Sequence, residues 1–468
     1  MLEKIGAAVW GWPTMLLFVG VGVLFTVRLR GLQITRLGRA LRSIFKEEGK
    51  GGGISSYAAL CTSLAATIGT GNIVGVATAM CAGGPGALFW MLVAALFGMA
   101  TQYAEGFLSV KYRIRQGDHW LGGPFLYIER GLGKNWKWLA VLFAAIGVTV
   151  GLLGVGTVTQ VHSITSAVEN FFDQERTHIA FSLFGRQYSW AAVISGAVVA
   201  VAAGLVLLGG VKRIANVCEM LVPLMSLTYV LFSCILLIRC ADRILPAFRL
   251  IVRSAFTPRA ALGATAGITL KNALRMGIGR GVYTNEAGLG TTPIAAAAAR
   301  SGDPFRQGLV TMTGTFIDTI VICTITGLCL TVTGAWNQNA LAGVQITDYA
   351  WRTALPWSQS LSSFCLMTCL AFFGFSTIVG WSFYAEQCLN YLSGGKVKAV
   401  RFYRMFYVLA VAAGPYLTVS AAWEMADILN ALMALPNLTA LLLLQDNVIR
   451  DTRAHIQKCN LTGRGKNN

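Results

Sequence analysis

Charged residues are scarce in this sequence, and their scarcity argues against an ordinary soluble domain. Only 12% of the 468 residues are Asp, Glu, Lys or Arg, against about 25% in a typical soluble protein. Apolar residues make up 55%, more than so few charges would shield from water. A transmembrane helix needs about 20 mostly apolar residues, so eleven of them would use about 220. The composition therefore predicts an all-α polytopic membrane protein.

Motifs for metal binding, disulfide pairing and catalysis are also missing from the sequence. The four histidines are scattered. The eleven cysteines contain no C-x-x-C pair and lie mostly inside apolar segments, where Cys acts as a small core residue. The pair Gly69-x-Gly71 follows no strand, which excludes a nucleotide-binding loop. Because no hydrolytic or redox constellation is present, we expect neither an enzyme nor a bound cofactor.

A membrane topology accounts for the net charge of +18. In a soluble protein it would suggest nucleic-acid binding, but here the basic residues lie in short loops between apolar runs. The two alternating sets of loops hold 26 and 9 Lys and Arg residues. Since Lys and Arg are retained in the cytoplasm, we expect no nucleic-acid partner, an N-terminus outside and a cytoplasmic C-terminus.

Hydropathy predicts eleven spans. They lie near 12–27, 55–79, 86–109, 138–158, 190–209, 217–238, 276–299, 308–334, 361–391, 402–421 and 424–445. The first has the length of a signal-peptide core, but Arg28 and Arg30 stand where a cleavage site should be, so we expect it to be retained. In the outer loop 239–262, five Arg alternate with apolar residues and predict a helix lying flat in the membrane interface.

Two of the predicted spans contain residues that interrupt a helix. The second contains Gly69-Thr70-Gly71-Asn72 near its middle, and the seventh contains NEAGLGTTP at 285–293. Gly frees the backbone, Pro removes a donor, and Thr and Asn supply oxygens. Lone glycines would indicate close helix packing, but two such clusters five spans apart favour broken helices. In an inverted repeat, such breaks bind an anionic group at half-helix N-termini and a cation at unwound carbonyls.

The same spacing predicts how the chain is divided. We expect an added N-terminal transmembrane helix at 1–30 and a first repeat of spans 2–6 at 31–262. A second repeat of spans 7–11 follows at 263–446, and a cytoplasmic tail at 447–468.

Acidic side chains at membrane depth are costly and often functional. We expect Glu105 to form a structural ion pair with Lys111 or Arg113. Asp318 fits an ion ligand and a helix–helix hydrogen bond equally well, and Glu286 could cap the second break or face the pathway. The sequence has no long Asp/Glu/His relay, which argues against a dedicated proton pathway.

Span 9 carries Ser376 and Thr377 close to Trp381. Positions i and i+4 share a helical face, so Thr377 and Trp381 can face one cavity, where hydroxyl oxygens suit a sodium ion and an indole closes over a small ligand. On spacing alone, Trp381 fits a packing or interface role equally well. Gln160 falls at the end of span 4, near the outer face, and Glu386 near the inner end of span 9.

At these residues the sequence resembles the alanine or glycine:cation symporter family, the sodium:alanine symporters of bacteria and archaea. The matching stretches are ISSYAALCTSLAATIGTGNIVGVATAMCAGGPGALFWM (54–91), GMATQYAEGFLSVKYR (98–113), GGPFLYIERGLG (122–133), RMGIGRGVYTNEAGLGTTPIAAAA (275–298) and FGFSTIVGWSFYAEQC (373–388). The resemblance covers most of the chain from about residue 28 to 450. It implies eleven spans, a leucine-transporter-type inverted repeat (5+5) with two discontinuous helices, and sodium-coupled uptake of small neutral amino acids.

The resemblance also implies site residues. Positions that match the family's substrate site are Gly69, Thr70, Gly71, Asn72, Gln160, Asn285, Thr377 and Trp381. By analogy of fold, the sodium site would consist of carbonyls near Ala65 and Ile68 with the hydroxyls of Ser376 and Thr377. The backbone amides of the first break would hold the substrate carboxylate.

We therefore expect a secondary active symporter in the plasma (inner) membrane of a bacterium or archaeon, importing alanine or glycine with Na+ by alternating access. Its partners would be the amino acid, Na+ and membrane lipid. A proton- or lithium-coupled carrier of a related small amino acid stays open as an alternative. From other classes, a channel would need a continuous polar pore. A transporter-like sensor would need a soluble signalling domain, for which 446–468 leaves no room. The substrate ranking and the oligomeric state are open.

Overall fold

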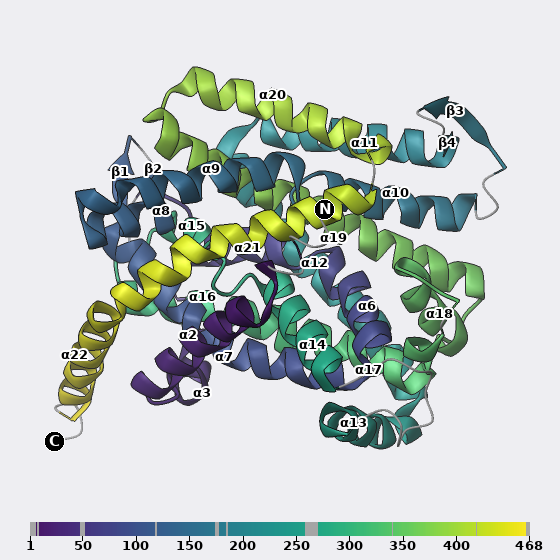
Figure 1. Ribbon diagram of the computed structural model, residues 1–468, viewed down its shortest axis with the longest axis horizontal. Helices are drawn as coiled ribbons and strands as arrows, with labels where there is room; N and C mark the ends of the chain where they lie inside the picture. Colours follow the sequence, from purple (N-terminus) through teal and green to yellow (C-terminus); the bar gives the residue numbers. More distant parts are fainter. Residues whose placement is uncertain are drawn as a thin grey trace.

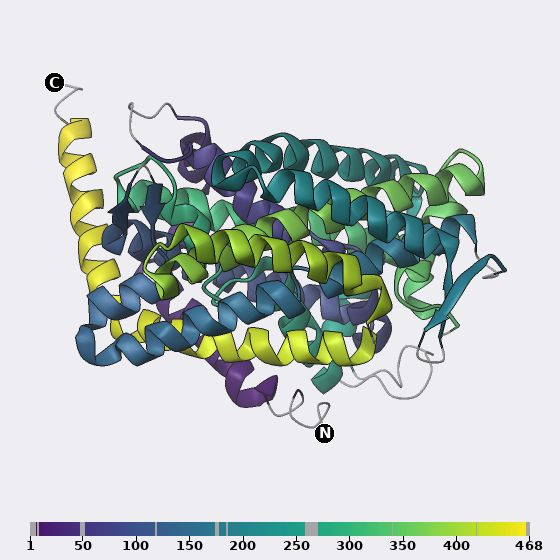
Figure 2. The ribbon, with the colours of Figure 1, turned by 90° about the horizontal axis from the view of Figure 1, so that it is seen from above.

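The computed structural model describes residues 6, 9–46, 52–117, 119–173, 177–183, 186–257, 270–338, 340–417 and 419–464. Helices dominate, and the long ones run roughly along the long axis of the molecule (Figure 1 and Figure 2). The strands of the described ranges form two antiparallel hairpins, β1 (Ile114–Gln116) with β2 (His119–Leu121) and β3 (Ile179–Leu183) with β4 (Arg186–Ser189). The two hairpins lie at opposite ends of the molecule (Figure 1).

Each of the eleven predicted spans corresponds to a helix or an interrupted helix. In chain order these are α2 (Trp12–Arg28), α5 (Ser56–Thr67) with α6 (Val74–Gly83), α7 (Gly86–Tyr112), α9 (Lys137–Leu153) with α10 (Val158–Phe172), α11 (Trp190–Leu207), α12 (Gly210–Arg239), α14 (Leu270–Asn285) with α15 (Thr292–Ala297), α16 (Pro304–Thr315) with η5 (Phe316–Cys323) and α17 (Thr324–Thr333), α19 (Gln359–Ser393), α20 (Val397–Ala413) and α21 (Val419–Leu443). Among the described residues, seven helices are long and apolar enough to cross a membrane, and the bent pair α5–α6 makes eight. The predicted all-α polytopic fold is confirmed.

Span 4 is longer than predicted. Hydropathy ended it at 158, but after an interruption at 154–157 the helix continues as α10 to Phe172. The first part of α10 carries several polar residues (VTQVHSITS), which hide it from a hydropathy search, although Val161 and Ile164 are buried. Gln160 consequently lies in the interior, only 2% exposed, rather than near the outer face.

The predicted loop helix and the predicted tail both form regular structure. α13 (Ala241–Phe256) confirms a helix within 239–262, while its position flat in the interface stays a prediction. Most of the predicted tail is the helix α22 (Gln445–Arg464). It is fastened to α7 by a hydrogen bond between the Tyr103 and Thr452 hydroxyls (2.8 Å) and by an ion pair between Lys111 and Asp451 (2.6 Å).

The two broken helices pack against one another in opposite senses. α5 contacts α15, and α6 contacts α14, so the first half of each broken helix meets the second half of the other. This is the arrangement that two antiparallel broken helices produce. The remaining short helices connect the spans: α3 (Leu32–Thr35), α4 (Leu37–Ile44), α8 (Pro124–Tyr127) and α18 (Val344–Ala354). The exact division into repeats at 31–262 and 263–446 stays a prediction.

Candidate functional site

The first break separates α5 from α6 by a bend of 62°. Its centre is the short turn η1 (Thr70–Asn72). The Asn72 side chain accepts a hydrogen bond from the Gly69 amide (3.0 Å), so this amide is occupied. Within the described residues, no backbone hydrogen bond leaves the amides of Thr70 and Gly71. These two amides, in η1 directly before α6, are the ones that can receive an anionic group.

The second break separates α14 from α15. Glu286 (φ +56°), Gly288 (φ +91°) and Gly290 (φ +84°) all have left-handed backbone, which ends a helix abruptly and is rare for a residue such as Glu. The Asn285 side chain stabilises the turn by accepting from the Ala287 amide (3.0 Å). The Thr291 hydroxyl donates to the Glu286 carboxylate, so Glu286 forms a hydrogen bond within the break.

Asp318 joins the two breaks. Its carboxylate accepts from the Asn72 side chain of the first break (2.7 Å) and from the neighbouring Thr319 hydroxyl (2.7 Å). The Thr319 hydroxyl in turn accepts from the Asn285 side chain of the second break (3.1 Å). Asp318 lies in η5, a stretch of π-helix between α16 and α17, and such stretches often occur at functional sites. Of the two roles that the sequence allowed for Asp318, the structure contains the hydrogen bond between helices.

The predicted sodium-site residues come together where α5 ends. The Ser376 hydroxyl lies 3.4 Å from the Ile68 carbonyl. Thr377 is adjacent, and a Cβ placed on Gly69 would lie only 2.5 Å from its hydroxyl. Ala65 is buried one turn earlier in α5. α19 approaches α5 closely at Gly380: a Cβ added there would lie 2.5 Å from the Ala66 amide nitrogen.

Gln160 and Trp381 border the same region. The side-chain amide oxygen of Gln160 accepts from the Thr70 hydroxyl (3.0 Å), which places α10 against the first break. Trp381 is fully buried, and its ring packs edge-on against Tyr384 at 5.7 Å. The indole nitrogen has no hydrogen-bond partner among the described residues. Trp381 is thus buried inside the protein rather than placed at a membrane interface.

The prediction for Glu105 is wrong. Its carboxylate accepts from the Asn437 side chain (2.6 Å), and neither of its predicted partners contacts it. Lys111 pairs with Asp451, and the Arg113 guanidinium donates to backbone carbonyls at the end of α15 and just after it. The local spacing was misleading, because residues six and eight positions apart on a helix do not share the side-chain contacts of residues three or four apart.

Two amide side chains that the sequence did not single out support the second break. Gln102 of α7 donates to the Asn285 carbonyl (2.8 Å) and accepts from the Thr315 amide (3.3 Å). Asn437 of α21 donates to the Gly288 carbonyl (2.8 Å) as well as to Glu105. The sequence signal that could have identified them is a polar amide inside an apolar span. Such a side chain indicates a buried hydrogen-bond partner, since buried polar groups are almost always hydrogen-bonded.

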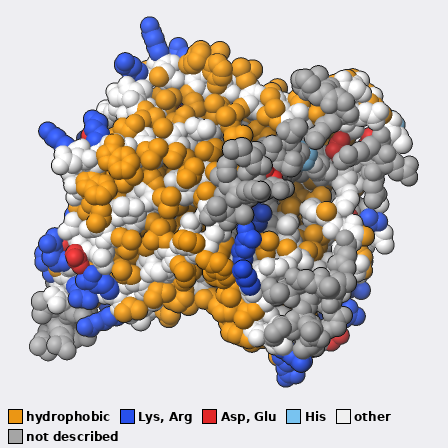
Figure 3. All heavy atoms as spheres, viewed as in Figure 1, with side chains coloured by type: hydrophobic (Ala, Val, Ile, Leu, Met, Phe, Trp, Pro, Cys, Tyr) orange, Lys and Arg blue, Asp and Glu red, His pale blue; other side chains and the backbone are white. Residues whose placement is uncertain are grey.

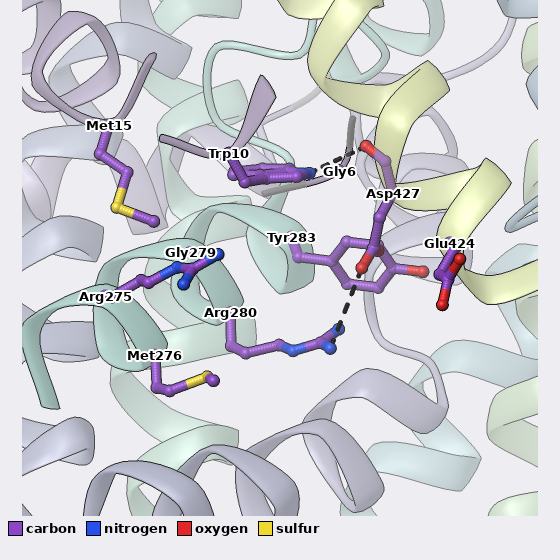
Figure 4. A pocket seen from close by; sticks show the side chains of 10 residues that line it. All are labelled: Gly6, Trp10, Met15, Arg275, Met276, Gly279, Arg280, Tyr283, Glu424 and Asp427. Carbon is purple, nitrogen blue, oxygen red and sulfur yellow. Dashed lines mark hydrogen bonds and ion pairs between the residues drawn. The ribbon is translucent and has the colours of Figure 1, made fainter. Parts of the chain in front are cut away.

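Two cavities approach the site on either side of Arg280 and Tyr283. One, of about 320 Å³, is lined by Gly71 at the first break and by residues of α6, α10, α14 and the start of α18. The other, of about 280 Å³, lies between α14, α21 and the N-terminal helix. Figure 4 shows the Arg280 side chain reaching across it toward Asp427, with an N–O distance of 4.0 Å. Arg280 and Tyr283 therefore line both cavities, and Asp427 lines only the second.

The comparisons with known proteins decide the family. A model described as the sodium:alanine symporter family matches residues 1–466. The chain belongs to this family. An uncharacterised transporter of Haemophilus influenzae is 46% identical over 460 residues, covering 98% of this chain and 96% of its own length. The sodium/alanine symporter AgcS of Methanococcus maripaludis is 41% identical over 463 residues, covering 97% and 96%.

Membership of the sodium:alanine symporter family makes the chain a multi-pass membrane transporter for cation-coupled amino acid symport, not an enzyme. A solved structure agrees on the fold: the crystal structure of MhsT in complex with L-phenylalanine has a TM-score of 0.58 at 13% identity, covering 85% of this chain and 90% of that one. At this identity the likeness concerns the fold alone. It bears out the expected leucine-transporter-type architecture with two discontinuous helices.

Proposed function

We propose that the chain imports alanine or glycine together with Na+. The observation that carries the proposal is the cluster of oxygens where α5 ends, in which the Ser376 hydroxyl lies 3.4 Å from the Ile68 carbonyl and Thr377 is the next residue. A helix C-terminus leaves carbonyls without intrahelical partners, and carbonyl and hydroxyl oxygens suit a hard cation. Na+ would bind there, with Ala65 supplying a further carbonyl.

The amino acid would bind next to the cation, at the first break. Its carboxylate would accept from the amides of Thr70 and Gly71, where the positive end of the α6 dipole lies. Gln160 and Asn285 would complete the polar wall. Trp381 would close over the side chain, and a closed indole rejects larger side chains by steric overlap. The printed name of AgcS, a sodium/alanine symporter at 41% identity, supports this choice of substrate and ion.

Uptake into proteoliposomes tests the proposal. Labelled alanine and glycine are offered with an inward Na+ gradient, and separately with a pH gradient alone. Accumulation above the external concentration that requires Na+ is the expected result, and it also separates a carrier from a channel. Failure of both gradients to drive either amino acid would refute the substrate assignment.

Three substitutions test the assigned residues. Asn72→Ala, Thr377→Ala and Trp381→Ala should each abolish Na+-driven uptake while the protein still inserts into the membrane. Thr368→Ala, a partly exposed Thr on the same helix, and Trp138→Ala, 62% exposed on α9, are matched controls that should transport normally. Normal uptake by all three site variants would overturn the site.

A proton-coupled carrier is the second candidate, favoured by the fully buried Asp318 between the two breaks. Accumulation driven by the pH gradient alone, lost in Asp318→Asn, would select this candidate over Na+ coupling.

We also propose that the end of the molecule with β1, β2 and α22 faces the cytoplasm. The Lys and Arg residues of 110–137 and 446–468 support this orientation through their retention inside the cell. A tag after residue 468 should resist protease added to intact cells, and digestion of the tag would reverse the orientation.

A further inference from the structure

A cavity of about 500 Å³ lies apart from the transport site, at the end of the molecule that carries β1 and β2. Its walls come from β2, from the junction of α11 and α12, from the last turns of α19 and from the start of α20. The symport proposal assigns no role to it. Its lining is basic and rich in side-chain amides.

The cavity has more positive than negative charge. Glu386 is the acidic residue of its lining, and it is fully engaged by Arg404, whose guanidinium donates to both carboxylate oxygens (2.7 and 2.8 Å). Lys212 and Arg401 also line the cavity. Neither of them forms an ion pair within the described ranges. Two uncompensated positive charges therefore face the cavity, beside the side-chain amide of Asn390.

An exposed apolar surface begins where the cavity ends. On α20, directly after Arg401, Phe402 is 61% exposed, Phe406 45% and Leu409 60%. Figure 3 shows basic side chains gathered at the end of the molecule where α20 begins, bordering a broad hydrophobic surface. In a membrane protein such a surface faces the lipid tails. The cavity thus places positive charge at the depth of the headgroups, next to a path for acyl chains.

We propose that this cavity binds the phosphate of an anionic phospholipid, with its acyl chains along α20. Lys212 and Arg401 supply the two charges that receive the phosphate. The paired Arg404 and Glu386 form the floor and stay neutral as a pair. Basic pockets between transmembrane helices are suited to anionic headgroups. A free phosphate shares the headgroup chemistry but would leave the apolar face of α20 without a ligand.

Lipid titration of the purified full-length chain tests the proposal. Phosphatidylglycerol and phosphatidylcholine are added separately, and the bound lipid is counted by native mass spectrometry. At about fivefold per basic residue near the surface, the double variant Lys212→Gln/Arg401→Gln should bind phosphatidylglycerol about thirtyfold more weakly. Lys396→Gln/Lys398→Gln removes the same charge from the neighbouring segment outside the cavity and should bind normally.

Other results would overturn the proposal. Equal loss in both double variants would indicate general surface charge, and equal binding of phosphatidylcholine would indicate apolar contact alone. Displacement of phosphatidylglycerol by millimolar inorganic phosphate would show a soluble-anion site instead. Lys212→Arg/Arg401→Lys keeps both charges and should keep the affinity, so a loss there would also count against the proposal. Because Lys212 and Arg401 are exposed, these variants should fold.

Discussion

Replacing Gly69 by Ala adds a single methyl group at a crowded point of the proposed site. The new Cβ would lie 2.5 Å from the Thr377 hydroxyl oxygen, whereas ordinary contacts begin at 3.4 Å. The backbone there is extended (φ −129°) and suits Ala, so the steric contact alone is tested. Thr377 must retreat by about 1 Å, which costs about 1–3 kcal/mol of overpacking. A displacement of this size in a working site lowers rates by up to about 100-fold.

We expect Gly69→Ala to lower the initial rate of Na+-driven alanine uptake by about 10- to 100-fold. Gly20→Ala, where an added Cβ has nothing within 4 Å, should transport at the normal rate. The thermal stability offers a second measurement. In a Thr377→Ala background the hydroxyl is gone, the remaining Cβ is 3.5 Å from the added methyl group, and Gly69→Ala should no longer destabilise. Full transport by Gly69→Ala, or the same destabilisation in both backgrounds, would refute the reasoning.

Three further predictions concern groups around the site. Asp318→Asn keeps the size of the side chain and one acceptor for Asn72, so with Na+ coupling it should retain measurable uptake. Asp318→Ala removes the shortest hydrogen bond of the buried Asn72 amide and leaves it only the Asp318 backbone carbonyl (3.2 Å) and the Cys323 sulfur (3.4 Å), so it should lower the stability by about 1 kcal/mol and lower uptake below that of Asp318→Asn; equal uptake by the two variants would contradict this. Asn437→Ala removes the donor from a buried carboxylate and a buried carbonyl and should lower the melting temperature in detergent, and an unchanged melting temperature would show that water replaces it. Partial burial acts to raise the pKa of Asp451, but hydrogen bonds from Lys111 and Arg450 outweigh it and hold this pKa below its usual value. The stabilisation present at neutral pH should therefore disappear as the pH falls through the lowered pKa; a melting-temperature difference between wild type and Asp451→Asn that does not shrink as the pH is lowered would argue against it.

The spans and the breaks could be predicted because their signals are local. An apolar run of about 20 residues can be recognised in the sequence without knowledge of its tertiary contacts. The cluster around Asn72 likewise indicates a break by its own composition. The continuation of span 4 as α10 was not predicted, because its local composition is too polar to signal a span. It crosses the interior of the protein with polar residues such as Gln160 turned to other helices, so its hydropathy does not report its burial.

The partners of the buried polar groups could not be predicted. Glu105 accepts from Asn437, which is 332 residues away in the sequence, whereas the predicted ion pair with the nearby Lys111 is absent. The link from Asn72 to Asp318 spans 246 residues. Gln102 and Asn437 bind backbone carbonyls that are left unpaired by the second break. A partner of this kind exists only once the fold is formed, so no spacing in the sequence reveals it.

The bridge through Asp318 has a consequence for leakage. The first break is bonded directly to the Asp318 carboxylate and the second is linked to it through the Thr319 hydroxyl, so a rearrangement of either break should disturb the hydrogen bonds of the other. A carrier open to both sides at once would let ions run down their gradient without cargo, at a loss of about 2.3 kcal/mol per charge for every 100 mV. A chain in which this tie is cut should therefore show ion slippage in the absence of amino acid before it shows any loss of amino acid binding.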